Sequence, residues 1–176
     1  LGNINSNSPL TYDGRMLGAL REFASRNQGT IVVPAVLAGA MGPVTPAGCV
    51  TEMLAETLAG MALTQLVRPG APVIMGSFVG AVSMRTGAPT FGTAEATQMI
   101  FATAQLARRL GVPCRSGGSL CSSKVADAQA AYDAYRVYVA AYPGGLFVDE
   151  ARGRGASLLL GLAQDQLSAQ RYPEAL

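Results

Sequence analysis

Residues 72–95 read PVIMGSFVGAVSMRTGAPTFGTAE, and this stretch decides the fold. The apolar run Val73–Met75 predicts a buried strand, and the glycine-rich polar segment from Gly76 to Arg85 predicts a loop. A helix follows near Thr93, with Glu95 placed favourably in its first turn. The stretch is therefore one βα unit. Because ligands of parallel α/β folds bind at the carboxyl ends of strands, its loop is the first candidate for a working face.

The same alternation of strand and helix recurs along the chain. Strand starts are expected near Ile4, Ile31, Val73 and Val112, and Thr30–Leu37 reads as one continuous buried strand. Helices are expected to follow from Asp13, Thr45-Pro46, Thr93 and Lys124. This pattern predicts an α/β fold with a parallel sheet. A closed (β/α)8 barrel of TIM type needs roughly 250 residues, so 176 residues predict about half of one.

The pattern weakens toward the C-terminus. We expect residues 1–134 to hold the central βα units and residues 135–176 to form a divergent, mostly helical segment. Within that segment, Leu146–Glu150 is a weak strand candidate, Arg152–Gly155 resembles a loop, and Ala156–Ala169 fits a last helix.

Composition excludes several classes of protein. There is no histidine, and the three cysteines lack CxxC or metal-type spacing, which argues against a metal site, a disulfide framework and a histidine-based triad. The net charge of +2 comes from scattered residues, so no nucleic-acid footprint is visible. Only 14% of residues are charged, against about 25% in average domains. This low charge suggests a homo-oligomer or another partner that shields the surface.

No apolar run has the length of a membrane span. The first residues, LGNINSNSPL, lack the basic and apolar regions of a signal peptide. We therefore expect a cytoplasmic protein with no membrane partner.

The predicted strand ends carry few ionisable groups. Arg85 and Arg115 suit a carboxylate or phosphate, since a guanidinium matches two oxygens, although Arg85 could instead anchor its loop through backbone carbonyls. Lys124 could be an ordinary solvated lysine at a helix start. Ser116–Ser119, SGGS, fits either a phosphate cradle or a tight turn. These residues support a polar, weakly ionic rim and specify no reaction.

Several blocks, in the same order, resemble the trimethylamine methyltransferase family. The resemblance runs from about Leu1 to Asp133, and its motifs are Ile4–Asp13 (INSNSPLTYD), Gly70–Val73 with Gly76–Phe78, Met84–Thr93 (MRTGAPTFGT), and Arg115–Gly118 with Ser122–Lys124.

The resemblance implies a (β/α)8 barrel enzyme that passes a methyl group from a methylated amine to the Co(I) corrinoid (cobalamin) of a small partner protein. The corrinoid would be carried by that partner and not bound tightly by this chain. The sequence has no pyrrolysine, which favours a quaternary amine such as glycine betaine over trimethylamine. The rim has no acid–base pair, which fits a reaction in which the protein chiefly positions its substrate.

Site residues follow from the resemblance only as expectations, and no catalytic residue is assigned. Arginine would suit a betaine carboxylate, and aromatic rings would suit the quaternary nitrogen. The expected substrate contacts are Asn5, Asn7, Tyr12, Ser77, Phe78, Met84, Arg85, Phe91, Arg115 and Ser116. The expected corrinoid contacts are Gly117, Gly118 and Lys124.

Two alternatives remain open at the level of sequence. The chain could be an inactive truncated paralogue or fragment that only binds a partner or itself, because the open edges of a half barrel invite association. An aldolase-like barrel fragment is more distant.

Overall fold

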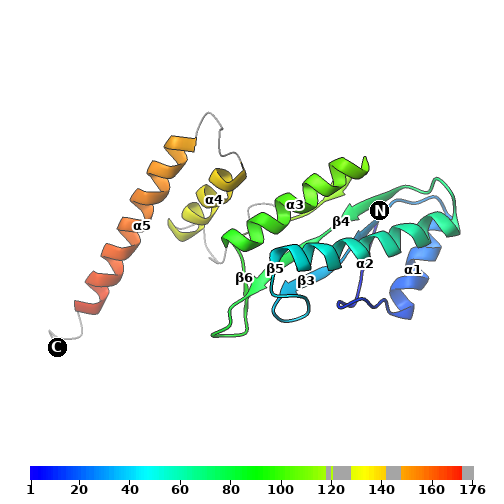
Figure 1. Cartoon of the computed structure of the whole chain (residues 1–176), viewed down its shortest axis with the longest axis horizontal. Helices are drawn as coiled ribbons and strands as arrows, with labels where there is room; N and C mark the ends of the chain where they lie inside the picture. The colour runs from blue at the N-terminus through cyan, green and yellow to red at the C-terminus, as the bar shows by residue number, and fades with distance from the viewer. Residues whose placement is uncertain (118–119, 121–127, 142–147, 172–176) are drawn as a thin grey trace. The chain divides into compact units, whose positions relative to one another are not determined.

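A computed structural model describes residues 1–117, 120, 128–141 and 148–171 (Figure 1). The chain divides into two compact units, each considered by itself. The first comprises Leu1–Pro89 and Gln98–Gly118, and the second comprises Thr90–Thr97 and Ser119–Leu176. The domain division expected at residue 134 stays a prediction.

The first unit contains a four-stranded sheet in the order β1-β2-β4-β7. Every neighbouring pair is parallel. The strands are β1 (Gly2–Asn5), β2 (Thr30–Val33), β4 (Val73–Gly76) and β7 (Cys114–Arg115). The predicted α/β class with a parallel sheet is confirmed, whereas closure into a barrel stays a prediction.

The chain builds a second sheet in the order β3-β5-β6, from β3 (Ala35–Ala38), β5 (Phe78–Val82) and β6 (Pro89–Thr90). Two expectations were therefore wrong. Thr30–Leu37 is two strands separated by Pro34, and the segment after Gly76 is mostly strand rather than loop. Register is kept across the interruption, because Val32 pairs with Met75 and Ala35 pairs with Phe78.

Pro34 and Gly76 explain this arrangement. Proline has no N–H, so the ladder is interrupted at Pro34, while its carbonyl accepts a 2.8 Å bond from the Phe78 amide. Gly76 is required by close strand approach, since a Cβ there would lie 2.5 Å from Cγ2 of Val33 and 2.6 Å from the Val32 carbonyl oxygen. The glycine that suggested a loop is thus a packing residue within a strand.

Three helices connect these strands, and each begins at a residue the sequence predicts. The Asp13 side chain caps α1 (Gly14–Ser25) by accepting from the amides of Arg15 and Met16. Thr45 caps α2 (Pro46–Val67), whose first residue is proline. The Thr93 hydroxyl accepts from the Ala96 amide at the start of α3 (Ala94–Leu110). The helices share one buried core with the sheet, which includes Ile4, Leu20, Val32, Met53, Met75, Val79 and Met99.

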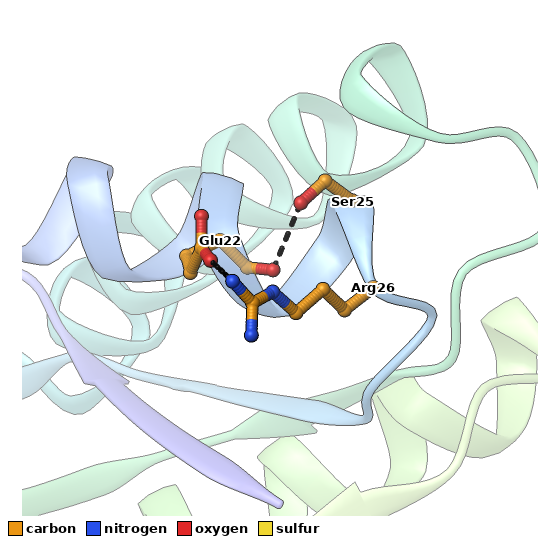
Figure 2. Close-up of polar contacts among 3 residues, drawn as sticks. All are labelled: Glu22, Ser25 and Arg26. Carbon is orange, nitrogen blue, oxygen red and sulfur yellow. Dashed lines mark hydrogen bonds and ion pairs between the residues drawn. The ribbon is translucent and has the colours of Figure 1, made fainter.

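The C-terminal end of α1 carries exposed polar contacts. Figure 2 shows the Arg26 guanidinium paired with the Glu22 carboxylate, and the Ser25 hydroxyl donating 3.0 Å to the Glu22 carbonyl oxygen. Arg26 and Glu22 are both largely exposed. Exposed pairs of this kind stabilise little, so Glu22 is a suitable control position for substitutions of buried carboxylates.

The second unit contains α4 (Ala128–Ala141) and α5 (Val148–Arg171). The strand expected at Leu146–Glu150 and the loop at Arg152–Gly155 were wrong for the described residues, since α5 begins at Val148. Asp149 and Glu150 lie in its first turn and pair with Arg152 and Arg154. These acids favour a helix start. Gly155 is buried, so the small residue faces the interior rather than ending the helix.

Among the described residues, no helix combines the length and apolarity needed to cross a membrane.

Candidate functional site

The sheet register places candidate residues on a common face. Ile4, Val32 and Met75 are register partners and lie in the core shared with α1, α2 and α3. Successive side chains of a strand point to opposite faces. The residues that follow these three, Asn5, Val33 and Gly76, therefore lie on the opposite side of the sheet, together with Arg115, the register partner of Gly76. We call this side the second face.

Asn5 and Arg115 stand at the two edges of the second face, and both are exposed. Asn3 lies on the same face, one strand period before Asn5, and its Nδ2 donates 3.1 Å to Oδ1 of Asn5. Between the edges the face is apolar, with Val33 buried and Gly76 contributing no side chain. The sequence predicted Asn5 and Arg115 as site residues, which stays a prediction, and it did not single out Asn3, the hydrogen-bond partner of Asn5.

Phe78 extends the second face beyond Gly76. Met75 and Val79 both belong to the core, and Ser77 between them is fully buried. By strand alternation, Phe78 points to the second face. The structure thus brings three predicted residues, Asn5, Phe78 and Arg115, to one side of the sheet at the carboxyl ends of its strands.

Ser77 and Ser116 lie together, but on the helix side of the sheet. Their hydroxyl oxygens are 2.7 Å apart, and the Ser77 amide donates 3.0 Å to the Arg115 carbonyl. On the same side, the Thr57 hydroxyl of α2 lies 3.3 Å from the Gly76 carbonyl oxygen. The two predicted serines therefore bind each other and tie β4 to β7.

The loop between β1 and α1 folds over a buried carboxylate that sequence reasoning missed. Glu56 of α2 is 2% exposed. It accepts hydrogen bonds from the hydroxyl of Ser6, from the hydroxyl of Ser8 at 2.7 Å and from the Leu10 amide at 2.7 Å. A signal was present in the sequence, because Glu52 and Glu56 are the only charged residues between Pro46 and Val67.

The side chains of Tyr12 and Asn7 form hydrogen bonds that hold this same loop. The Tyr12 hydroxyl donates 2.8 Å to the Glu56 carbonyl oxygen. Burial, and then the negative charge of Glu56, raises the pKa of Tyr12 to about 12. The Asn7 side-chain oxygen accepts 3.1 Å from the Asp13 amide. These contacts hold the loop, and a substrate contact by either residue stays a prediction.

Glu52 lies one helical turn before Glu56. Its Oε1 atom is buried and has no hydrogen-bond partner among the described residues. Burial, and then the charge of Glu56, raises the pKa of the Glu52 carboxyl. Burial, and then Glu52, likewise raises the pKa of the Cys49 thiol, whose Sγ donates 3.0 Å to the Pro43 carbonyl oxygen. Both effects favour the thiol over the thiolate.

Met84 and Arg85 occupy an exposed turn between β5 and β6. The amides of Thr86 and Gly87 both donate to the Ser83 carbonyl, at 3.2 and 2.8 Å. Met84 is 85% exposed. In the described part of the chain, neither Arg85 nor Arg115 forms an ion pair with a carboxylate, so both guanidinium groups can receive an anion.

The remaining predicted residues lie elsewhere. Phe91 belongs to the second unit, where a Cβ on Gly92 would lie 2.6 Å from Cγ of the buried Asp133. Gly117 follows Ser116 and is half-buried. Gly118 and Lys124 fall outside the described residues. Corrinoid contact by Gly117, Gly118 and Lys124 stays a prediction.

A groove of about 480 Å³ lies between α2 and α3. It is lined largely by apolar side chains, among them Val50, Met99 and Leu106, and also by Arg109. None of the predicted site residues lines this groove.

Comparison with known proteins gives a consistent result. The family model described as trimethylamine methyltransferase (MTTB) matches residues 1–159. A glycine betaine methyltransferase of Desulfitobacterium hafniense is 48% identical over 138 residues, which cover 78% of this chain and 29% of that protein. A proline betaine:corrinoid methyltransferase of Eubacterium limosum is 31% identical over 144 residues, covering 82% and 30%. A trimethylamine methyltransferase of Methanosarcina thermophila is 32% identical over 102 residues, covering 58% and 21%.

The chain spans less than a third of the length of these curated relatives. The match nevertheless covers most of the chain itself, including the β1–α1 loop, the second face and the turn that carries Arg85. The expected family is confirmed, and the chain belongs to the trimethylamine methyltransferase family.

Proposed function

We propose that the chain is part of a (β/α)8-barrel methyltransferase that takes a methyl group from a carboxylate-bearing quaternary amine such as glycine betaine. Support comes first from the likeness to a glycine betaine methyltransferase. The observation that carries the proposal is the position of Arg115, exposed on the second face beside an apolar stretch and opposite two asparagines. This pattern suits a ligand with a carboxylate at one end and methyl groups at the other.

Each residue of the second face would have a simple binding role. The Arg115 guanidinium presents two donors in a fork that matches a carboxylate, and Arg85 is a second proposed carboxylate contact. Phe78 offers an aromatic face to the quaternary nitrogen, which holds methyl groups but has no proton to donate. Asn5 contributes its amide Nδ2, because its bond with Asn3 uses the Oδ1 atom.

This arrangement suits methyl transfer from a quaternary nitrogen. When bound, the corrinoid of the partner protein supplies the nucleophile that accepts the methyl group. The amine leaves with the electron pair of its broken C–N bond as a neutral tertiary amine, so no general acid is needed. The chain's own task is to orient the substrate and exclude water.

The test is anaerobic incubation of the chain with reduced cobalamin and a set of quaternary amines. We expect methylcobalamin to form with glycine betaine, and to form less with choline, which has the same quaternary head but no carboxylate. Absence of methylcobalamin with every amine would count against the proposal. It would favour the alternative that the chain acts only as a module that binds a partner or itself.

A further inference from the structure

The Glu56 carboxylate is surrounded by donors from a single segment. It lies in α2 at 2% exposure, and its hydrogen bonds come from Ser6, Ser8 and Leu10 of the β1–α1 loop. No cation of the described residues pairs with it. Burying a carboxylate costs free energy unless hydrogen bonds replace its bound water. The loop supplies these bonds to Glu56, and the same bonds hold the loop in its conformation.

Leu10 shows how tightly the loop is fixed. Its φ is +55°, a left-handed conformation that leucine rarely adopts, and its side chain is 69% exposed. No core packing therefore explains the conformation. The Leu10 amide donates 2.7 Å to Oε1 of Glu56, and this bond holds the strained residue in place.

Glu56 also fixes the far end of the loop. Its carbonyl oxygen accepts from the Tyr12 hydroxyl at 2.8 Å, while its side chain holds Ser6, the residue directly after Asn5. Both ends of the loop are thus attached to one residue of α2. The attachment at Ser6 restrains the end of β1, where Asn5 meets the second face.

We propose that Glu56 is a positioning residue, which fixes the β1–α1 loop and thereby orients Asn5 on the second face for the substrate. The substrate part of this inference rests on the proposed function; the loop part does not. Glu56 acts through Asn5, because its side-chain hydrogen bonds within the described residues go to Ser6, Ser8 and Leu10, none of which belongs to the second face.

The chemistry of the three donors predicts which replacements are tolerated. An ionised carboxylate only accepts hydrogen bonds. In Glu56→Gln, the amide oxygen can still accept from the Leu10 amide, while the hydroxyls of Ser6 and Ser8 can rotate to accept from the new NH2 group. Glu56→Gln should therefore retain most of the geometry that Glu56→Ala loses.

The experiment measures amide hydrogen exchange and betaine binding in Glu56→Ala, Glu56→Gln and the control Glu22→Ala. Glu22 is a helical carboxylate too, but it is exposed. In Glu56→Ala we expect exchange at Leu10 to rise at least tenfold while exchange at the core residues Val32 and Met75 changes less. We expect glycine betaine affinity to fall about tenfold. Glu56→Gln should restore most of both, and Glu22→Ala should change neither.

If Glu56→Ala does not fold, Ser8→Ala replaces it in the experiment, because it deletes one donor and leaves the carboxylate in place. Ser8→Ala should raise amide exchange at Leu10 less than the tenfold expected for Glu56→Ala. Unchanged exchange at Leu10 in folded variants would overturn the proposal, as would an affinity loss that merely follows global unfolding. If the unchanged chain binds no betaine, the proposed function fails. Exchange at Leu10 then decides by itself whether Glu56 fixes the loop.

Discussion

The hydroxyl oxygens of Ser77 and Ser116 lie 2.7 Å apart, across the carboxyl ends of the neighbouring strands β4 and β7. Ser77 is fully buried, so its hydroxyl depends on this partner. We predict that Ser77→Ala and Ser116→Ala each lower the free energy of unfolding by about 1 kcal/mol. The double variant should cost less than the sum, because both changes remove the same bond. Urea unfolding of all four proteins measures the coupling, and strictly additive losses would show that the bond contributes nothing.

Gly76 provides a second test of strand packing. A Cβ there would lie 2.5 Å from Cγ2 of Val33, and overpacking of this kind costs roughly 1–3 kcal/mol. We predict such a loss for Gly76→Ala in denaturant unfolding. Gly18→Ala is the matched control, since Gly18 lies within α1 and a Cβ there meets nothing within 4 Å. Alanine should stabilise that helix by roughly 0.5–1 kcal/mol. Equal effects of the two changes would contradict the described strand contact.

Glu52 should make stability depend on pH. Burial, and then the charge of Glu56, raises the pKa of Glu52 in the folded state. The folded protein therefore holds this proton more tightly than the unfolded chain. The resulting stabilisation is fully present below about pH 4, the ordinary range for glutamate, and is lost as pH rises through the folded pKa.

Glu52→Gln removes this titration. We predict that the variant gains stability relative to the unchanged chain as pH rises from about 4. Removing the repulsion between Glu52 and Glu56, which lie at i,i+4, should contribute roughly 0.2–0.5 kcal/mol of this gain at neutral pH. Unfolding curves across the pH range measure the difference, with Glu22→Gln as an exposed control. A difference that stays constant with pH would contradict the assignment.

Replacing Arg85 tests whether this residue binds the substrate or only stabilises its own turn. If it contacts a substrate carboxylate, Arg85→Ala should weaken glycine betaine binding by about tenfold, equivalent to about 1.4 kcal/mol, while leaving the unfolding transition unchanged. Binding isotherms and unfolding curves together give the answer. Unchanged affinity for glycine betaine would show that Arg85 does not contact the substrate.

Local signals predicted the ends of elements well, because capping is decided by neighbouring residues. Asp13, Thr45 and Thr93 begin the helices where the sequence places them. Signals that depend on distant partners were misleading. Gly76 suggested a loop, yet a glycine is needed there because a Cβ would clash with Val32 and Val33 of the neighbouring strand. Gly155 suggested a loop, yet it lies within helix α5.

The same distinction applies to the site. Arg115 follows from the rule that ligands bind at strand ends, whereas Asn5 and Phe78 were expected as substrate contacts from the family resemblance. The register places Asn5 and Arg115 on one face, and strand alternation adds Phe78. Glu56 could not be found this way, because its role depends on donors from a loop more than forty residues earlier. Two carboxylates in an otherwise uncharged helix mark Glu52 and Glu56 as unusual, but the hydrogen-bond partners of Glu56 become visible only in the fold.

Titration of the unchanged chain and of Arg115→Ala with glycine betaine and with choline tests the central claim most directly. We predict that the unchanged chain binds glycine betaine more tightly than choline. We also predict that Arg115→Ala weakens glycine betaine binding by about tenfold or more and leaves choline binding unchanged, because only the carboxylate contact is lost. Equal affinity of the two proteins for glycine betaine would contradict the assignment of Arg115 and of the second face.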